Sequence, residues 1–413
     1  MDYFSKYNLV KKNDGGETII FNTLYKSIVY LEPKYSPFFD KETIDIESFP
    51  SKLYKFLKKN MMINSSNEEN DLLDQFIQQT NFSDTYRFVF FSTLKCNLRC
   101  DYCYEDHINT VLNLSIYDQV YDYISTLDNP KIEVDWFGGE PLLTLPQMKK
   151  FTKRMFSLLS KENYSASITT NGTLLSPKVF KDCVDMNIYL YQITLDGLPE
   201  THDKHRPFAN GSGSFYTIAN NLSNIKSTDA DVQIVIRVNM DKESDIDPLL
   251  TELEQFIGDD KRFFVYLYPI QKWCERTNNS LLLNNDSFEK VAGEAFRRHP
   301  KLQDYQLYSL MNSNLSCDYH KKNSFVINPN GLLTDCTIDY KKNAINDCTN
   351  MDFYNKNKPT APLCTNFDCP LFPVCLGYLC KDADKKHCND FVQTQREVLK
   401  RLFIKVKDIP DEE

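Results

Sequence analysis

The stretch RFVFFSTLKCNLRCDYCYE, residues 87–105, joins an apolar run to a loop that carries three cysteines. The apolar run predicts a β-strand that is buried on both faces. Cys96, Cys100 and Cys103 follow it with three and then two residues between them. Three thiolates on one loop can each bind a different iron of a 4Fe–4S cluster and leave the fourth iron open. Zinc sites usually use CxxC pairs, so a zinc site and plain reduced thiols are the alternatives.

Strands and helices alternate from this loop onward. Strand-like runs occupy residues 87–93, 131–137, 165–170, 189–195, 232–240 and 262–268, with helical patterns between them. Six such units predict an α/β fold, either a partial barrel or a doubly wound sheet, with right-handed crossovers. We expect ligands at the carboxyl ends of the strands.

The chain divides into three segments that differ in pattern. Residues 1–82 combine extended runs with helical patterns and predict a small α+β module, with a loop at 64–70. Residues 83–300 hold the strand–helix units and predict a partial (β/α)6 barrel. Residues 301–413 hold eight of the 13 cysteines, which predicts a Cys-rich C-terminal domain that binds metal.

Composition argues against several classes of protein. The net charge of −9 disfavours a nucleic-acid partner held by phosphate contacts. No apolar run reaches the ~18 residues of a membrane-spanning helix, and the N-terminus lacks the apolar core of a signal peptide. We therefore expect a cytoplasmic protein without a membrane partner. In that reducing compartment, an odd number of clustered cysteines predicts metal ligands, whereas the isolated Cys183 is expected to be a buried side chain.

A second motif follows the second strand, at Gly138, Gly139, Glu140 and Pro141. Glycines let the backbone approach a ligand closely, and Glu140 can add a charge-assisted hydrogen bond. Taken alone, the same four residues also fit an ordinary turn.

Polar residues also end the later strands. They are Thr170 and Asn171 on the third, Thr194 and Asp196 on the fourth, and Arg237 on the fifth. An arginine is costly to bury without an anion, so Arg237 is a candidate for binding an anionic group. For His202, His205 and Arg206, two roles are open: hydrogen bonds that stabilise a loop, and catalysis.

The order of CNLRCDYCYE, GGEPLL, ITTNG and LDG resembles the radical S-adenosylmethionine superfamily. In that family the open iron chelates the amino and carboxylate groups of S-adenosylmethionine, and one electron yields a 5′-deoxyadenosyl radical that abstracts hydrogen from carbon. The resemblance implies that the cofactor is contacted by Tyr102, Gly138, Gly139, Glu140, Pro141, Thr170, Asn171, Thr194, Asp196 and Arg237.

The C-terminal cysteines form a further pattern. Cys317 and Cys336 flank a segment, VINPNGLLTDC, that predicts a β-hairpin turning at Asn330 and Gly331. The remaining members follow with gaps of four, five and four residues and then a longer one: Cys364, Cys369, Cys375, Cys380 and Cys388. A pair of zinc sites is the alternative on spacing alone.

This region resembles the SPASM extension of radical S-adenosylmethionine enzymes, although its two four-residue gaps are longer than usual. The resemblance implies two auxiliary 4Fe–4S clusters, and so three in the whole chain. The first would take Cys317, Cys336 and Cys380, and the second would take Cys364, Cys369, Cys375 and Cys388. The fourth ligand of the first is open among Cys348, Cys274 and a substrate thiolate.

Within the superfamily, the chain resembles maturases of ribosomally made peptides, which form thioether or carbon–carbon crosslinks. This implies a precursor-peptide substrate and a reducing partner such as flavodoxin or ferredoxin. Residues 1–82 would then be a winged-helix-like module that binds the leader peptide by adding a strand to a sheet, and an ordinary packing module is an equal alternative. No catalytic residue is assigned.

Two other functions stay open. An anaerobic sulfatase maturase, which oxidises one Cys or Ser to formylglycine, uses the same domain set, although an N-terminal module of about 80 residues disfavours it. A non-catalytic iron–sulfur or zinc scaffold would leave the glycine-rich and Asn-Gly motifs without a purpose.

Overall fold

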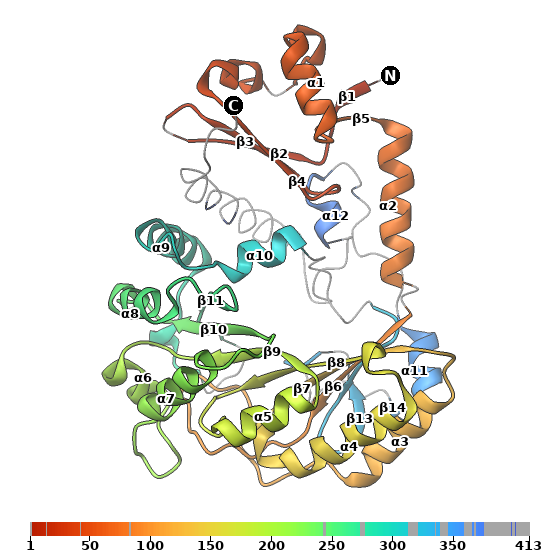
Figure 1. Cartoon of the computed structure of the whole chain (residues 1–413), viewed down its shortest axis with the longest axis vertical. Helices are drawn as coiled ribbons and strands as arrows, with labels where there is room; N and C mark the ends of the chain where they lie inside the picture. The colour runs from red at the N-terminus through yellow and green to blue at the C-terminus, as the bar shows by residue number, and fades with distance from the viewer. Residues whose placement is uncertain are drawn as a thin grey trace.

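A nine-stranded sheet lies in the lower half of the molecule as Figure 1 shows it, with strand order β11-β10-β9-β8-β7-β6-β12-β13-β14. The computed structural model describes residues 2–13, 15–41, 43–81, 84–242, 245–272, 277–312, 321–334, 336–338, 346–358, 366, 369–375, 398 and 401. The predicted α/β fold with a large parallel sheet is confirmed.

Six parallel strands are neighbours in the order in which the chain makes them. They are β6 (Thr85–Phe91), β7 (Lys131–Phe137), β8 (Tyr164–Thr170), β9 (Ile188–Thr194), β10 (Gln233–Met240) and β11 (Phe263–Pro269). Each crossover therefore moves one strand in the same direction, as in a partial barrel, whereas a doubly wound sheet reverses direction. The carboxyl ends of all six strands meet at one edge of the sheet.

The C-terminal part of the chain extends this sheet beyond residue 300. Strand β12 (Ser324–Ile327) pairs in parallel with β6, and β13 (Leu332–Thr334) and β14 (Asn346–Asp347) follow antiparallel. The predicted hairpin turn is confirmed, because Gly331 lies between β12 and β13 at a φ of +79°, which favours glycine.

Six helices cover one face of the sheet (Figure 1): α3 (Leu114–Ser125), α4 (Leu145–Leu158), α5 (Pro177–Asp185), α7 (Phe215–Lys226), α8 (Asp247–Ile257) and α9 (Asn285–Arg298). Their apolar residues form one core with alternate residues of the strands, such as Phe90, Trp136 and Ile168. Cys183 on α5 is fully buried in this core, as predicted.

The two faces of the strands differ along the sheet. The run at 87–93 was expected to be buried on both faces, and Phe88, Val89, Phe90 and Phe91 of β6 are all buried. On β8, Tyr164, Ala166 and Ile168 are buried, whereas the residues between them are partly exposed. Helices cover only one face of β8, and the other face lines a cavity.

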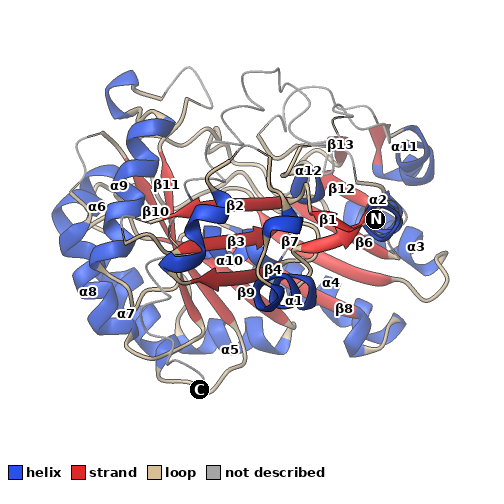
Figure 2. Ribbon diagram, turned by 90° about the horizontal axis from the view of Figure 1, so that it is seen from above, coloured by secondary structure: helices blue, strands red, loops and turns tan. Residues whose placement is uncertain are grey.

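The N-terminal module holds an antiparallel sheet of β2 (Asn8–Lys12), β3 (Thr18–Asn22) and β4 (Ser27–Leu31). A short pair, β1 (Asp2–Phe4) with β5 (Ile63–Ser65), joins it to the helices α1 (Ser51–Lys59) and α2 (Ser66–Asn81). An α+β module was predicted here. Figure 2 shows its three-stranded sheet lying over the large parallel sheet.

The loop predicted at residues 64–70 is wrong, because α2 already begins at Ser66. Ser65 and Glu68 form a capping box. The backbone N–H of Ser65 donates to the Glu68 carboxylate at 2.9 Å, and the backbone N–H of Glu68 lies 3.5 Å from the Ser65 hydroxyl. This pair satisfies backbone donors at the start of the helix, so the polar run is its first turn.

The module packs on the rest of the chain through small apolar clusters, one at α10 and one that includes Phe372. Leu9, Ile19 and Phe21 from its sheet contact Leu307 and Leu310 of α10 (Tyr305–Asn312).

The remaining described elements are α6 (Pro199–His205), α11 (Met351–Asn357), α12 (Phe372–Cys375) and the 3-10 helices Pro33–Phe39, Ile46–Ser48, Pro141–Thr144, Lys161–Asn163, Asn279–Leu281 and Cys348–Asn350. Of the helices that the structure describes, none has both the length and the apolar character to cross a bilayer.

Candidate functional site

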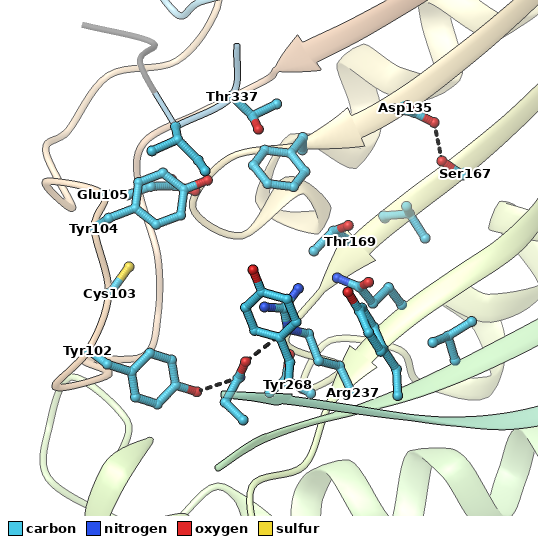
Figure 3. Close-up of a pocket in the computed structure, with 18 of the residues that line it drawn as sticks. Tyr102, Cys103, Tyr104, Glu105, Asp135, Ser167, Thr169, Arg237, Tyr268 and Thr337 are labelled. Atoms are coloured by element: carbon cyan, nitrogen blue, oxygen red, sulfur yellow. Dashed lines mark hydrogen bonds between the residues drawn. The ribbon is translucent and has the colours of Figure 1, made fainter. Parts of the chain in front are cut away.

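A cavity of about 560 Å³ lies on the uncovered face of the parallel strands (Figure 3). One wall is the loop after β6, where Tyr102, Cys103, Tyr104 and Glu105 line it. The other walls come from β6 to β11, and Thr337 and Ile338 also line it. As expected for parallel strands, the ligand-sized space reaches their carboxyl ends.

Residues 96–103, called the cluster loop here, bring the three predicted thiols within electrostatic reach of one another. Burial raises the pKa of the Cys96 thiol to about 11, and the charges of Glu140 and Cys100 add to the rise. Burial also raises the pKa of the Cys103 thiol, with Glu105 and Cys100 adding to it. Such thiols bind as thiolates only when a cation compensates their charge.

The donor set of this loop fits a 4Fe–4S cluster. The side-chain amide of Asn171 lies 3.7 Å from the Cys96 sulfur, and the backbone N–H of Leu98 lies 3.4 Å from it, as N–H groups do around cluster sulfurs. In the described part of the chain, no three Cys, His, Asp or Glu side chains converge on one metal ion. A cluster does not need such convergence, because each thiolate binds a different iron.

The two glycines after β7 lie against the segment that joins β6 to the cluster loop. Gly139 has a φ of +32°, and a side-chain carbon placed there would lie 2.1 Å from the carbonyl oxygen of Lys95. The next backbone N–H, of Glu140, donates to the same carbonyl at 2.8 Å. The close approach that requires glycine is therefore an approach to Lys95, the residue directly before the cluster loop.

The Glu140 carboxylate is fully buried and is bound by the end of β8. It accepts hydrogen bonds from the Thr170 hydroxyl and the Asn171 backbone N–H, each at 2.8 Å. The Asn171 side chain in turn donates to Asn97 in the cluster loop at 2.8 Å. Neither Glu140 nor Thr170 is among the residues that line the cavity, so the structure brings these predicted residues together as a brace behind the loop.

Asp196, just after β9, connects three parts of the site. Its buried carboxylate accepts a hydrogen bond from the Tyr102 hydroxyl and another from the Asn239 backbone N–H, the latter at 2.7 Å. Arg206 donates to the Tyr102 oxygen at 2.7 Å and lies 3.8 Å from the Asp196 carboxylate. Burial raises the pKa of Asp196, and the Arg206 charge opposes that rise.

Arg237 and Thr194, the two candidates at the ends of the fourth and fifth strands, line the cavity. The Arg237 guanidinium stacks over Tyr268 at 4.1 Å from the ring centre, and its Nε donates to Asn239 at 2.8 Å. Among the described residues, it has no carboxylate within ion-pair distance. It therefore presents positive charge to the cavity, where an anionic group of a ligand can bind.

Asn239 and Tyr268 were missed by the sequence reasoning. Asn239 lies two residues after Arg237 and so faces the same side of β10, which was the available signal. Tyr268 near the end of β11 gave no motif. His202 proved structural, because its Nδ1 accepts the Asp196 backbone N–H at 3.1 Å and its Nε2 therefore carries the proton toward Ser214.

Four of the C-terminal cysteines lie in the described part of the chain. Cys336 precedes the two cavity residues Thr337 and Ile338, and its charge contributes to the raised pKa of Tyr104. Cys348 is buried, with its thiol 3.3 Å from the Gly331 carbonyl, and Cys369 and Cys375 lie at α12. The remaining predicted ligands lie outside the described residues: Cys274, Cys317, Cys364, Cys380 and Cys388.

Comparison with known proteins gives a consistent relationship. Residues 91–251 match the Radical SAM superfamily. A cysteine-type anaerobic sulfatase-maturating enzyme of Clostridium novyi (strain NT) is 29% identical over 223 residues, which cover 49% of this chain and 56% of that enzyme. The chain spans about half the length of the curated relatives it matches.

Two solved structures share the fold. Native anSMEcpe with bound AdoMet and Kp18Cys peptide has a TM-score of 0.61 at 17% identity, covering 79% of this chain and 99% of that one. Streptococcus suis SuiB has a TM-score of 0.50 at 14% identity, covering 90% of this chain and 94% of that one.

Proposed function

We propose that this chain, which carries a radical SAM domain over residues 91–251, is an enzyme that modifies a peptide by radical chemistry started from S-adenosylmethionine. Cys96, Cys100 and Cys103 would hold the 4Fe–4S cluster. When bound, the cluster and S-adenosylmethionine supply a one-electron reduction that releases a hydrogen-abstracting radical.

The observation that carries this proposal is the cavity with Cys103 on one wall and Arg237 on another (Figure 3). Arg237 offers a guanidinium to the carboxylate of the cofactor, and Tyr268 holds that guanidinium by stacking. Thr194 and Asn239 add polar groups at the neighbouring strand ends. The brace formed by Glu140 behind the loop keeps the thiols in place.

For the product, we propose a thioether or carbon–carbon crosslink in a precursor peptide. The module at residues 1–82 supports this choice, because the edge strands β2 and β4 of its sheet each pair with only β3 in the described chain. An extended leader peptide can add to such an edge. Two auxiliary clusters on the C-terminal cysteines would receive the electron released with the product, and flavodoxin or ferredoxin would reduce the first cluster.

Formylglycine formation is the second candidate. It is favoured by the similarity to the sulfatase-maturating enzyme of C. novyi and to anSMEcpe, which binds the Kp18Cys peptide. The two candidates differ in the product, because a crosslink removes hydrogen from two joined residues whereas formylglycine forms at a single Cys or Ser. Mass spectrometry with fragmentation of a peptide treated by the enzyme separates them.

Anaerobic reconstitution tests the shared part of the proposal. We expect about twelve irons per chain for three clusters, and 5′-deoxyadenosine from S-adenosylmethionine with dithionite as reductant. Cys100→Ala should lose four irons and all 5′-deoxyadenosine. Cys183→Ala is the matched control, because this buried cysteine lies in the helix-covered core, and it should keep both. Zinc in place of iron in the wild-type protein would contradict the proposal.

A further inference from the structure

Residues 205–209, called the strap here, run antiparallel to the cluster loop and pair with it along its length. The backbone N–H of Ala209 donates to Asn97 O at 2.8 Å, and that of Arg99 donates to Pro207 O at 2.9 Å. Leu98 and Phe208 form a β-bridge between these two hydrogen bonds. The strap begins at His205, the last residue of α6, and is far from the cluster loop in sequence, so it is a second segment that supports the loop.

A second pair of contacts closes the other end of the strap. The Asp101 backbone N–H donates to His205 O at 3.2 Å, and the two side chains meet at 2.7 Å. The His205 ring also lies 3.4 Å from Asp241. The Asp101 hydrogen bond raises the pKa of His205. When the ring is protonated, the carboxylates of Asp101 and Asp241 neutralise its charge at this end of the strap.

Arg206, in the middle of the strap, has an unused donor. Its residue is 6% exposed, and it lines the cavity. One guanidinium nitrogen donates to Tyr102, but the buried Nε has no hydrogen-bond partner in the described chain. A buried N–H without an acceptor costs roughly 1–3 kcal/mol, so an acceptor is expected at this point.

The charge of Arg206 also acts on the cluster loop. Burial raises the pKa of the Cys100 thiol, and the Arg206 charge opposes that rise more than any other charged group. Arg99, on the loop itself, differs: it is exposed, and its guanidinium donates to the backbone carbonyls of Cys96 and Leu98, each at 2.7 Å. Solvent screens such an exposed charge, whereas it does not screen a buried one to the same extent.

We propose that Arg206 is a positioning residue that also sets the reduction potential of the cluster on Cys96, Cys100 and Cys103. Its guanidinium holds Tyr102 at one side and keeps a permanent positive charge beside Cys100, with Nε–H available to a cluster sulfur. A fixed positive charge favours the reduced, more negative cluster. This inference rests on the proposed cluster.

The test is a redox titration of the reconstituted wild-type protein and three variants, followed by the electron paramagnetic resonance signal of the reduced cluster. The titration is made with and without S-adenosylmethionine. The signal that changes on its addition belongs to the cluster on Cys96, Cys100 and Cys103, whose open iron binds it. Arg206→Gln removes the charge, Arg206→Lys keeps it, and Arg99→Gln removes the exposed charge from the same loop.

We expect Arg206→Gln to lower the ratio of reduced to oxidised cluster at least tenfold at a fixed potential, which is about 59 mV for one electron. Arg206→Lys and Arg99→Gln should each change it less than threefold. An unchanged ratio in Arg206→Gln, or an equal fall in Arg99→Gln, overturns the inference while leaving the proposed function intact.

If Arg206→Gln assembles no cluster, the Arg206→Lys variant decides alone. A ratio within threefold of wild type supports the role of the charge, and a tenfold fall despite the retained charge overturns it. A wild-type protein that binds no iron would contradict the proposed function itself, and this inference with it.

Discussion

At the scale of single residues, the site depends on buried polar groups whose protonation is set by their neighbours. Burial lowers the pKa of His202 to about 2, and the charges of Arg206 and His205 add to the effect. The ring is therefore neutral at every pH near neutrality. Its Nδ1 can then accept the Asp196 backbone N–H, which positions the carboxylate that Tyr102 and Asn239 bind.

His202 predicts a pH dependence of stability. The unfolded chain binds a proton on this residue below a pKa of about 6.5, whereas the folded chain does not. Its contribution to the free energy of unfolding is therefore full above that pH and falls by about 1.4 kcal/mol per pH unit below it. Urea unfolding of the iron-free protein between pH 5 and 7.5 measures this slope.

The control for this experiment is the variant His202→Asn, whose side-chain oxygen can accept the same N–H. As the pH is lowered, the free energy of unfolding of this variant should fall less steeply than that of the wild type. The two slopes should differ by up to about 1.4 kcal/mol per pH unit, the value for one proton. Equal slopes in the two proteins would show that His202 takes up a proton in the folded state.

At the scale of elements, two loops and a strap are packed so closely that they behave as one support for the thiols. The turn after β7 touches the loop after β6 through Gly139, and the strap after α6 pairs with the same loop from the other direction. The cluster loop therefore has little regular structure of its own, and neighbouring elements hold it.

Gly139→Ala tests this support. A methyl group at this position meets the Lys95 carbonyl, so the cluster loop must move, and we expect loss of most of the iron that Cys96, Cys100 and Cys103 bind. Gly211→Ala is the control, because Gly211 has a φ of +86° but no atom within 4 Å of the added carbon. It should cost about 1 kcal/mol in stability and keep its iron. Equal iron in the two variants would refute the close packing as the cause.

At the scale of the whole molecule, the N-terminal module meets the rest of the chain through small apolar clusters, one of them around α10. Leu310 is fully buried there against the module's sheet. The main core behind the parallel strands is separate and much larger.

Leu310→Ala should therefore weaken the docking of the module by about 3 kcal/mol. Hydrogen exchange should become faster in β2 and β3 and stay unchanged in β7 and β8. Phe56→Ala is the control, because this residue on α1 is exposed, and it should change neither region. Faster exchange in β7 and β8 as well would mean that the module and the barrel unfold together.

Much of the fold and part of the site could be predicted from local sequence. The six strand runs, the hairpin turn at Gly331 and the burial of Cys183 follow from periodicity and turn chemistry over a few residues. The grouping of three thiols on one loop follows from their spacing. Thr194 and Arg237 were predicted at the cavity because polar residues at the carboxyl ends of parallel strands share one edge.

Contacts between residues far apart in the chain could be seen only in the folded molecule. The sequence was enough to predict the strand runs and the cysteine loop, since these depend on neighbours along the chain. It did not reveal that Glu140 accepts a hydrogen bond from Thr170, that one face of β8 lines a cavity, or that Arg206 donates a hydrogen bond to Tyr102. Those facts depend on which surfaces pack together, because burial and hydrogen-bond partners are set by the assembled sheet and its loops.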